Sequence, residues 1–206
     1  MNELRLALTP SGTLYAHAQA VPDGDQAACQ TLLSAHRLPL VEDWLAQGTG
    51  RATLLAKGLA AGWFQYVSRS LPSPELRLDV FIPHVIVGLS GERKAALASF
   101  GGFCVAHCGF SAAEAQRLCV AAADHCAFIA RQQRRGGLGI SPMVSFHDDP
   151  VMLMPRVSFI PFWVGGIDHC LILGGEPLIN GPAFVQLVWG LQVSATRFTR
   201  VGVSLA

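Results

Sequence analysis

Charged side chains are scarce in this chain. Asp, Glu, Lys and Arg account for 14% of the 206 residues, whereas 51% of the residues are hydrophobic. An average globular protein carries roughly 25% charged residues, so this chain has little polar surface to cover its apolar interior. Large exposed apolar areas mark contacts with partners or with further copies of a protein. The composition therefore favours a chain that binds a protein partner or forms a homo-oligomer.

A dominant charge of either sign is also missing. The 15 basic and 14 acidic residues leave a net charge of +1 at pH 7, which gives no general attraction to phosphate backbones or anionic lipid. Arg131, Arg134 and Arg135 form one basic cluster. A solvated helix end explains that cluster better than a phosphate contact in a helix-turn-helix. Nucleic-acid binding is therefore not predicted.

Export and membrane signals are absent as well. The N-terminus has Glu3 near its start and no long apolar run, so it does not resemble a secretory signal and a cytoplasmic protein is expected. Two uncharged stretches, 95–113 and 177–196, have the length of about 20 residues that spans a bilayer. Both contain glycines, and the second also contains prolines and glutamines, so no membrane span is predicted.

The common nucleotide and hydrolase motifs are missing. Gly48-Thr-Gly50 and Gly136-Gly-Leu-Gly139 are glycine-rich, but neither has the spacing of a P-loop or of a dinucleotide fingerprint. Neither Gly-x-Ser-x-Gly nor His-Glu-x-x-His occurs. The sequence therefore predicts no cofactor and no catalytic residue, and it leans away from an enzyme.

No charged or Pro/Ser-rich linker divides the chain, so a single α+β domain is predicted over residues 1–206. Residues 4–20 contain two short apolar runs around a Thr-Pro-Ser-Gly segment, a pattern that predicts an N-terminal β-hairpin. Beyond it, Asp25 is positioned to cap a helix over 26–36, and a second short helix fits 40–47.

The clearest local signal is the capping box Ser111-Ala-Ala-Glu114. In this motif the Ser hydroxyl and the Glu carboxylate each satisfy a backbone amide at the start of a helix. An amphipathic helix over 112–135 is predicted, ending at Gly136. A helical stretch over 90–100 precedes it, so the middle of the chain is expected to form a helical hairpin.

Strand-like patterns flank this helical centre. Residues 76–82 alternate between apolar and polar side chains up to Pro83, whereas residues 51–70 fit no single pattern. Further strands are predicted at 143–146, 156–164, 169–173, 184–193 and 197–205. The expected fold is α+β, with an antiparallel sheet built from the N-terminal hairpin and a C-terminal meander, packed against the central helical hairpin.

Cysteine and histidine concentrate in the middle of the chain. The residues are Cys104, His107, Cys108, Cys119, His125 and Cys126. Zinc ligation and a Cys108 nucleophile beside His107 are two functional interpretations. Core packing is preferred, because Cys119 and Cys126 lie two helical turns apart on the apolar side of the predicted helix. All six cysteines of the chain are expected to be reduced thiols.

Two polar groups in the C-terminal half are the other candidates for chemistry. His147-Asp148-Asp149 and Asp168-His169 both lie at predicted strand ends. Carboxylates and imidazoles that converge could bind a divalent ion or act as acid and base. His147, Asp149, Asp168 and His169 are therefore metal-ligand candidates, although ordinary turn chemistry explains both groups.

Part of the chain resembles a known family. The residues concerned are Leu4-Arg-Leu-Ala-Leu-Thr-Pro-Ser-Gly-Thr-Leu14, Trp44-Leu-Ala-Gln-Gly-Thr-Gly50 and Leu54-Leu55. In their order, residues 4–58 resemble the accessory segment that precedes the motor in bacterial SNF2-family helicases. The motor motifs are absent, so the resemblance implies an accessory module beside an NTPase and no ATPase activity.

The preferred interpretation is a non-catalytic protein-interaction or scaffolding subunit. Its predicted interface lies in the apolar segment 177–206, at Phe184, Leu187, Trp189 and Leu191. Apolar residues occur there at both odd and even positions, which suggests a strand that needs cover on both faces. The alternative is a small metal- or Cys/His-dependent enzyme that uses the two His/Asp groups or the cysteines.

Overall fold

The computed structural model describes residues 4–74, 77–136, 143–148 and 154–201. These residues form an α+β structure, which confirms the predicted fold class. Contacts divide the chain into two compact units. The first unit comprises Met1–Leu78, Val164–Gly166 and Asn180–Ala206, and the second comprises Asp79–Trp163 and Ile167–Ile179. A compact set of contacts does not show that either part folds alone, so the single domain stays a prediction.

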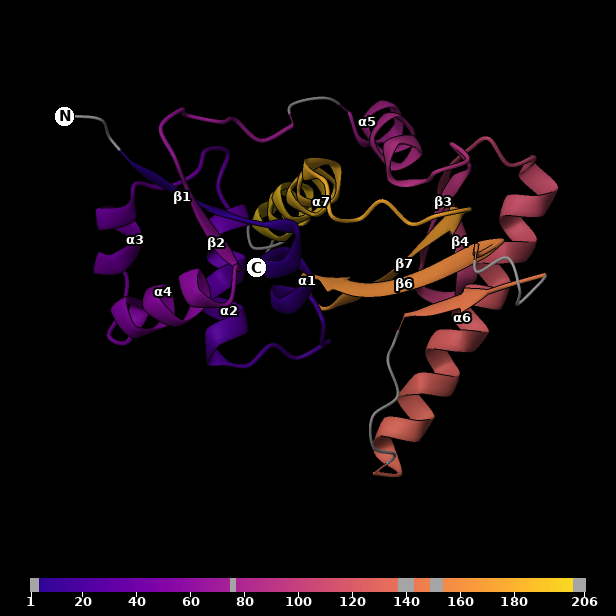
Figure 1. Ribbon diagram of the computed structural model, residues 1–206, viewed down its shortest axis with the longest axis horizontal. Coiled ribbons are helices and arrows are strands. Elements are labelled where there is room, and N and C mark those ends of the chain that lie inside the picture. Colours follow the sequence, from indigo (N-terminus) through magenta and orange to yellow (C-terminus); the bar gives the residue numbers. More distant parts are fainter. Residues whose placement is uncertain (1–3, 75–76, 137–142, 149–153, 202–206) are drawn as a thin grey trace. The chain divides into compact units, whose positions relative to one another are not determined.

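The first unit combines a two-stranded sheet with helices (Figure 1). Its elements are β1 (Arg5–Leu8), α1 (Pro10–Ala16), α2 (Gly24–Gln30), the 3-10 helix η1 (Thr31–Leu33), α3 (Val41–Ala46), α4 (Arg51–Ala60), β2 (Phe64–Val67) and α7 (Pro182–Val201). β1 and β2 are antiparallel, and α1 contacts both α2 and α7. Trp44 is fully buried at the edge of the Phe64 ring, with 5.6 Å between the ring centroids.

The predicted N-terminal hairpin is wrong. β1 is a strand, but its partner is β2, and residues 10–16 form α1 instead of a second strand. The Thr9 hydroxyl accepts a hydrogen bond from the Gly12 amide at 3.1 Å, and Pro10 occupies the first turn of α1. Thr at the cap and Pro directly after it are both favoured at a helix N-terminus. The Thr-Pro-Ser-Gly segment therefore starts a helix.

The two short helices predicted after residue 25 are present with changed bounds. α3 matches its predicted range closely, whereas α2 ends at Gln30 and is capped by Asp23, not Asp25. The Asp23 carboxylate accepts from the Gln26 amide at 2.7 Å, and the Gln26 side chain accepts from the Asp23 amide at 3.0 Å. This reciprocal pair satisfies two amides at once. Asp25 instead forms an ion pair with Lys57 at 2.7 Å.

The second unit is a five-stranded sheet in the order β4-β3-β7-β6-β5. Its elements are α5 (Leu78–Ile86), the 3-10 helix η2 (Val87–Leu89), β3 (Ala95–Ser99), the 3-10 helix η3 (Phe100–Gly102), β4 (Phe103–Cys108), α6 (Ala112–Arg134), β5 (Val144–Phe146), β6 (Val157–Val164) and β7 (Ile167–Gly174). β3 pairs antiparallel with both β4 and β7. α6 contacts β3, β4 and β7 along one face of the sheet.

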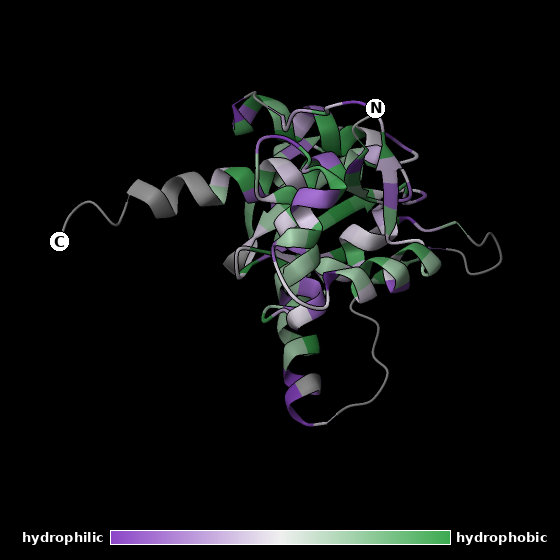
Figure 2. Cartoon of the chain, turned by 90° about the vertical axis from the view of Figure 1, so that its left-hand side faces the viewer, coloured by the Kyte–Doolittle hydropathy of each residue, from purple (hydrophilic) through white to green (hydrophobic). Residues whose placement is uncertain are grey.

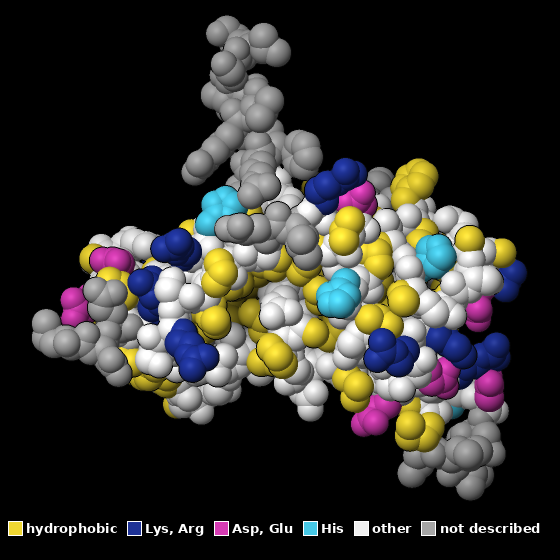
Figure 3. Space-filling model, turned by 90° about the horizontal axis from the view of Figure 1, so that it is seen from above, with side chains coloured by type: hydrophobic (Ala, Val, Ile, Leu, Met, Phe, Trp, Pro, Cys, Tyr) yellow, Lys and Arg dark blue, Asp and Glu magenta, His cyan; other side chains and the backbone are white. Residues whose placement is uncertain are grey.

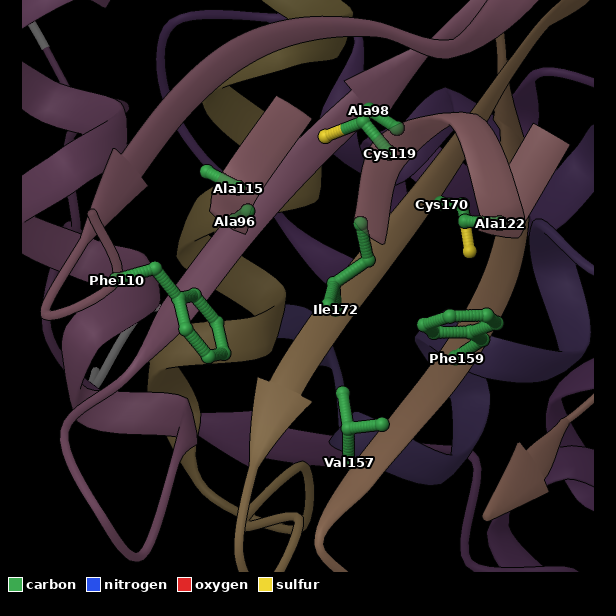
Figure 4. Packing of buried hydrophobic residues seen from close by; sticks show 10 residues of the cluster. All are labelled: Ala96, Ala98, Phe110, Ala115, Cys119, Ala122, Val157, Phe159, Cys170 and Ile172. Carbon is green, nitrogen blue, oxygen red and sulfur yellow. The ribbon is translucent and has the colours of Figure 1, made fainter. Parts of the chain in front are cut away.

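Small side chains dominate the core between α6 and the sheet, which Figure 4 shows at close range. Its buried members are Ala96, Ala98, Phe110, Ala115, Cys119, Ala122, Val157, Phe159, Cys170 and Ile172. Alternate residues of β3, β6 and β7 contribute, because successive side chains of a strand point to opposite faces. The strands contribute two alanines and a cysteine, so the helix can approach the sheet closely.

The long helix is confirmed, as are the Ser111 cap at its start and the glycine after its end. The Ser111 hydroxyl accepts from the Glu114 amide at 3.3 Å, and Gly136 follows the helix at a φ of 72°. Glycine adopts positive φ without a Cβ clash, which suits a helix end. Arg131 and Arg134 lie in the last turn, and this end of α6 is hydrophilic in Figure 2.

The predicted helical hairpin is wrong because only its second helix exists. Residues 95–99 form β3, which is buried between β4 and β7. The alanine-rich segment has high helix propensity. Helix propensities differ by only about a few tenths of a kcal/mol per residue, and burial inside a sheet overrides such a preference. A β-hairpin through Gly101 and Gly102, both at positive φ, takes the place of the first helix.

Three of the C-terminal strands are confirmed and two are wrong. β5, β6 and β7 match the predictions at 143–146, 156–164 and 169–173, whereas residues 184–193 lie in α7. Helix α7 also contains residues 197–201, and residues 202–205 lie outside the described part. Apolar residues at both odd and even positions fit a helix with a broad apolar stripe as well as a strand that is buried on both faces.

The strand predicted at 76–82 is also wrong. Residues 78–82 lie in α5, where Phe81, Ile82, Val85 and Ile86 are buried. Their spacing of one, three and four residues is helical, and Pro83 lies inside the helix instead of ending a strand. Residue 76 lies outside the described residues.

Both uncharged stretches are accounted for by these elements. Residues 95–113 contain β3 and β4, and residues 177–196 contain the first part of α7. Among the helices that the structure describes, none combines the length and the apolar character needed to cross a bilayer.

Gly12 is the position in the first unit where adding a methyl group should lower stability most. A Cβ at Gly12 would overlap the Trp63 carbonyl group, whose oxygen accepts from the Thr9 amide at 2.9 Å. We expect Gly12→Ala to lower the free energy of unfolding by about 1–3 kcal/mol, as overpacking does. Gly24→Ala is the matched control, since a Cβ at Gly24 would meet nothing within 4 Å. Urea denaturation followed by tryptophan fluorescence measures both, and equal midpoints would contradict the described packing.

Candidate functional site

The strand β4 forms one edge of the five-stranded sheet. Among the described strands it pairs with β3 alone, so the backbone groups on its other side have no strand partner. Its sequence, Phe-Cys-Val-Ala-His-Cys, contains no Asp, Glu, Lys or Arg. Phe103 is 70% exposed and Val105 is 46% exposed. An uncharged edge strand with exposed apolar side chains is a template for pairing with another strand.

A β-bulge determines which way the β4 side chains point. Leu97 lies opposite Ala106 and Ala98 lies opposite Cys104, so Val105 is the extra residue between the two pairs. Opposite residues share a sheet face. Cys104 therefore faces α6 with Ala98, whereas Phe103, opposite Ser99, lies on the other face. The bulge leaves Val105 without an opposite residue in β3.

Other large exposed apolar side chains are more scattered. Val120 and Phe128 are exposed on α6. The exposed Asp124 lies between them in the sequence, and the exposed Arg117 precedes Val120 by three residues. In the view of Figure 3, exposed hydrophobic side chains lie among basic, acidic and histidine side chains. Single exposed hydrophobic residues are normal in proteins. On β4, which has six residues, two exposed apolar side chains coincide with an open backbone edge, whereas β5 at the other edge has three residues and exposes Phe146.

Four cysteines meet beneath α6 and form what we call the thiol cluster: Cys104, Cys119, Cys126 and Cys170. Cys119 and Cys170 belong to the buried core, and Cys104 and Cys126 pack against it half-buried. Cys104 acts on the pKa of Cys119, and Cys126 and Cys170 act on the pKa of each other, which defines two pairs within the cluster. Each pair connects α6 to a strand of the sheet.

The pKa values distinguish the two pairs. Burial, with Cys104 adding to it, raises the pKa of Cys119 to about 12. The pKa of Cys126 is lowered, because its thiolate accepts a hydrogen bond from the Cys170 thiol, and this outweighs the opposing effects of burial and of Asp168. The same hydrogen bond, followed by burial, raises the pKa of Cys170. Cys126 is therefore the more acidic thiol of its pair.

The metal-ligand candidates lie in two separate places. His147 follows β5, whose Phe146 is opposite Val157 at the start of β6. Asp168 and His169 lie in β7 beyond the Gly165–Gly166 turn, at the other end of β6. About six residues of strand at roughly 3.3 Å each separate the two groups. The structure does not bring them together.

Each group also has other partners nearby. Asp148 forms an ion pair with Arg156 at 3.1 Å. His169 stacks on Phe162 with 5.4 Å between ring centroids, and burial lowers its pKa. Asp149 lies outside the described residues. No group of three or more His, Cys, Asp or Glu side chains among the described residues could hold a metal ion, and metal binding by the candidates stays a prediction.

Cys108 and His107 do not form a nucleophile and base. They are neighbours in β4, where His107 lies opposite Ala96 and Cys108 lies opposite Ala95. Ala96 belongs to the face covered by α6, so the two side chains point to opposite faces of the sheet.

The four predicted interface residues of segment 177–206 are buried. Phe184, Leu187, Trp189 and Leu191 are 0%, 0%, 4% and 7% exposed in α7. The Trp189 indole donates to the Ala35 carbonyl oxygen at 2.8 Å. Their role in an interface stays a prediction, and Leu178 of the same segment is 38% exposed.

The sequence interpretation missed β4 and one thiol pair. The alternation of Phe103, Val105 and His107 with small residues was a strand signal inside a segment interpreted as uncharged and glycine-rich. The contact between Cys126 and Cys170 joins residues far apart in sequence, and it depends on where α6 crosses the sheet.

Comparison with known proteins adds one structural similarity. No protein-family model matches the chain, and no curated protein matches it. The chain is similar to the crystal structure of a Roadblock/LC7 domain from Streptomyces avermitilis, with 16% sequence identity and a TM-score of 0.40. The match covers 61% of this chain and 99% of that chain.

We expect Cys126 to be alkylated by iodoacetamide faster than Cys119. Only the thiolate reacts, and a thiol with a pKa of about 12, such as Cys119, is almost fully protonated at neutral pH. The rate at Cys126 should therefore rise at lower pH than the rate at Cys119. Mass spectrometry of peptides after timed labelling measures both rates, and equal or reversed rates would contradict the assigned pKa directions.

Proposed function

We propose that this chain is a non-catalytic protein-interaction domain and that the open edge of β4 is where it binds another chain. The observation that carries the proposal is the exposure of Phe103 and Val105 on an uncharged edge strand. A strand added there would pair with the free backbone groups of β4 and cover both side chains. Main-chain hydrogen bonds supply affinity in this mode of recognition, and side-chain contacts supply specificity.

A second copy of the chain is the occupant that β4 suits best. Two identical strands that pair antiparallel form a two-fold interface, in which each residue contacts its counterpart reciprocally. Like charges directly opposite one another would oppose such pairing. β4 contains no Asp, Glu, Lys or Arg, so self-pairing brings none of these charges together. Charged residues make up only 14% of the whole chain, so few like charges oppose its association with a second copy.

The resemblance of residues 4–58 adds a wider setting to this proposal. It implies that such a domain works as an accessory to an NTPase-containing complex. β4 lies outside residues 4–58, so self-association and membership of that complex are separate proposals.

Lysine at position 105 tests the interaction edge. Val105 is half-exposed and has no opposite residue in β3, so the variant Val105→Lys should fold. We expect wild-type protein to show a rising average mass in light scattering as its concentration increases. Val105→Lys should remain monomeric over the same range, because Lys on an edge strand opposes pairing.

Val21→Lys is the matched control for this experiment. Val21 is 82% exposed and lies outside the helices and strands, so this variant should associate like wild type. Circular dichroism confirms that all three proteins are folded. The proposal fails if wild type stays monomeric at every concentration, or if Val105→Lys associates as wild type does.

A further inference from the structure

Cys126 and Cys170 are placed to react with each other. Cys170 lies in β7 beside Ala122 of α6, as Figure 4 shows. Cys126 is one helical turn beyond Ala122 on the same face of α6, because residues four apart in a helix are neighbours. Cys126 packs against the core cluster that includes Cys170. The helix residue and the strand residue therefore lie in the same part of the core.

The surroundings give the two sulfur atoms different access. Cys170 is 3% exposed, whereas Cys126 is only partly buried and packs at the border of the core. A small reagent from solvent therefore reaches Cys126 first. Cys170, held behind it, is positioned to attack whatever forms on Cys126. This arrangement of an accessible thiol beside a resolving thiol is typical of redox-sensitive cysteines.

The second pair of the thiol cluster lacks these features. Cys119 is fully buried, and its raised pKa keeps it protonated. Cys104 is half-buried, but its thiol donates to the Ala106 carbonyl oxygen at 3.6 Å. The first oxidation is therefore expected at Cys126, not at Cys104 or Cys119.

We propose that Cys126 and Cys170 form a reversible disulfide when the protein meets a hydroperoxide. The Cys126 thiolate attacks the terminal peroxide oxygen, so that an S–O bond forms and the O–O bond breaks. With hydrogen peroxide, the leaving hydroxide takes the thiol proton and departs as water. The Cys170 sulfur then attacks the Cys126 sulfur, the S–S bond forms, and the S–O bond breaks with loss of a second water. Two thiols are oxidised, one peroxide is reduced to two waters, and a dithiol reductant reverses the change.

Peptide mapping of the full-length protein tests the proposal. After brief treatment with hydrogen peroxide and alkylation without reductant, we expect the number of free thiols to fall by two per chain. A peptide linked through Cys126 and Cys170 should appear and should disappear on treatment with dithiothreitol. Loss of no thiols, or a link between other cysteines, would overturn the proposal.

Two variants separate the steps. In Cys170→Ala the second step is blocked, so Cys126 should accumulate as a sulfenic acid that dimedone captures. In Cys126→Ala neither dimedone capture at position 126 nor the link can form, and Cys170 should stay reduced. Cys104→Ala is the matched control, because it breaks the other pair and should leave the Cys126–Cys170 link unchanged. Wild-type mapping decides the outcome if a variant does not fold, and dimedone capture at Cys104 or Cys119 in place of Cys126 would contradict the proposal.

Discussion

The second unit depends on the close packing of α6 against the sheet through small side chains. Ala115, Cys119 and Ala122 of the helix meet Ala96 and Ala98 of β3, together with Cys170 of β7. Alanine and cysteine at both surfaces let the helix approach closely, and protein interiors tolerate few voids. Larger residues there would hold α6 away from the strands. The same packing places the thiols of α6 in one core cluster with those of β4 and β7.

β4 is the longer of the two edge strands of this sheet. Residues 95–98 of β3 are buried between its two neighbours, whereas β4 has a partner on one side only among the described strands. Charged residues usually protect such an edge, and β4 has none of Asp, Glu, Lys or Arg. The Val105 bulge twists the edge locally but does not cover it. An edge of this kind suits a chain that functions with another chain bound to it.

The sequence predicted the elements whose signals are local. Ser111 and Glu114 located α6, and alternating or continuous apolar runs located β5, β6 and β7. It failed where tertiary burial decides the outcome: the alanines of β3 favour a helix in isolation, and the apolar run containing Phe184 fits a buried helix as well as a strand. The site needed contacts that spacing does not encode, above all the meeting of Cys126 with Cys170. The low charge content and the absence of complete catalytic motifs pointed from the sequence toward binding.

Hydrogen exchange of the β4 amides tests the central claim most directly. If β4 pairs with a second copy, the amides that point away from β3 should exchange fast in dilute protein and slow down as concentration rises. Amides of the buried strand β3 serve as the internal reference and should exchange equally slowly at all concentrations. If the β4 amides exchange at one rate throughout while the average mass of the protein increases, association uses another surface. That result would contradict pairing through β4.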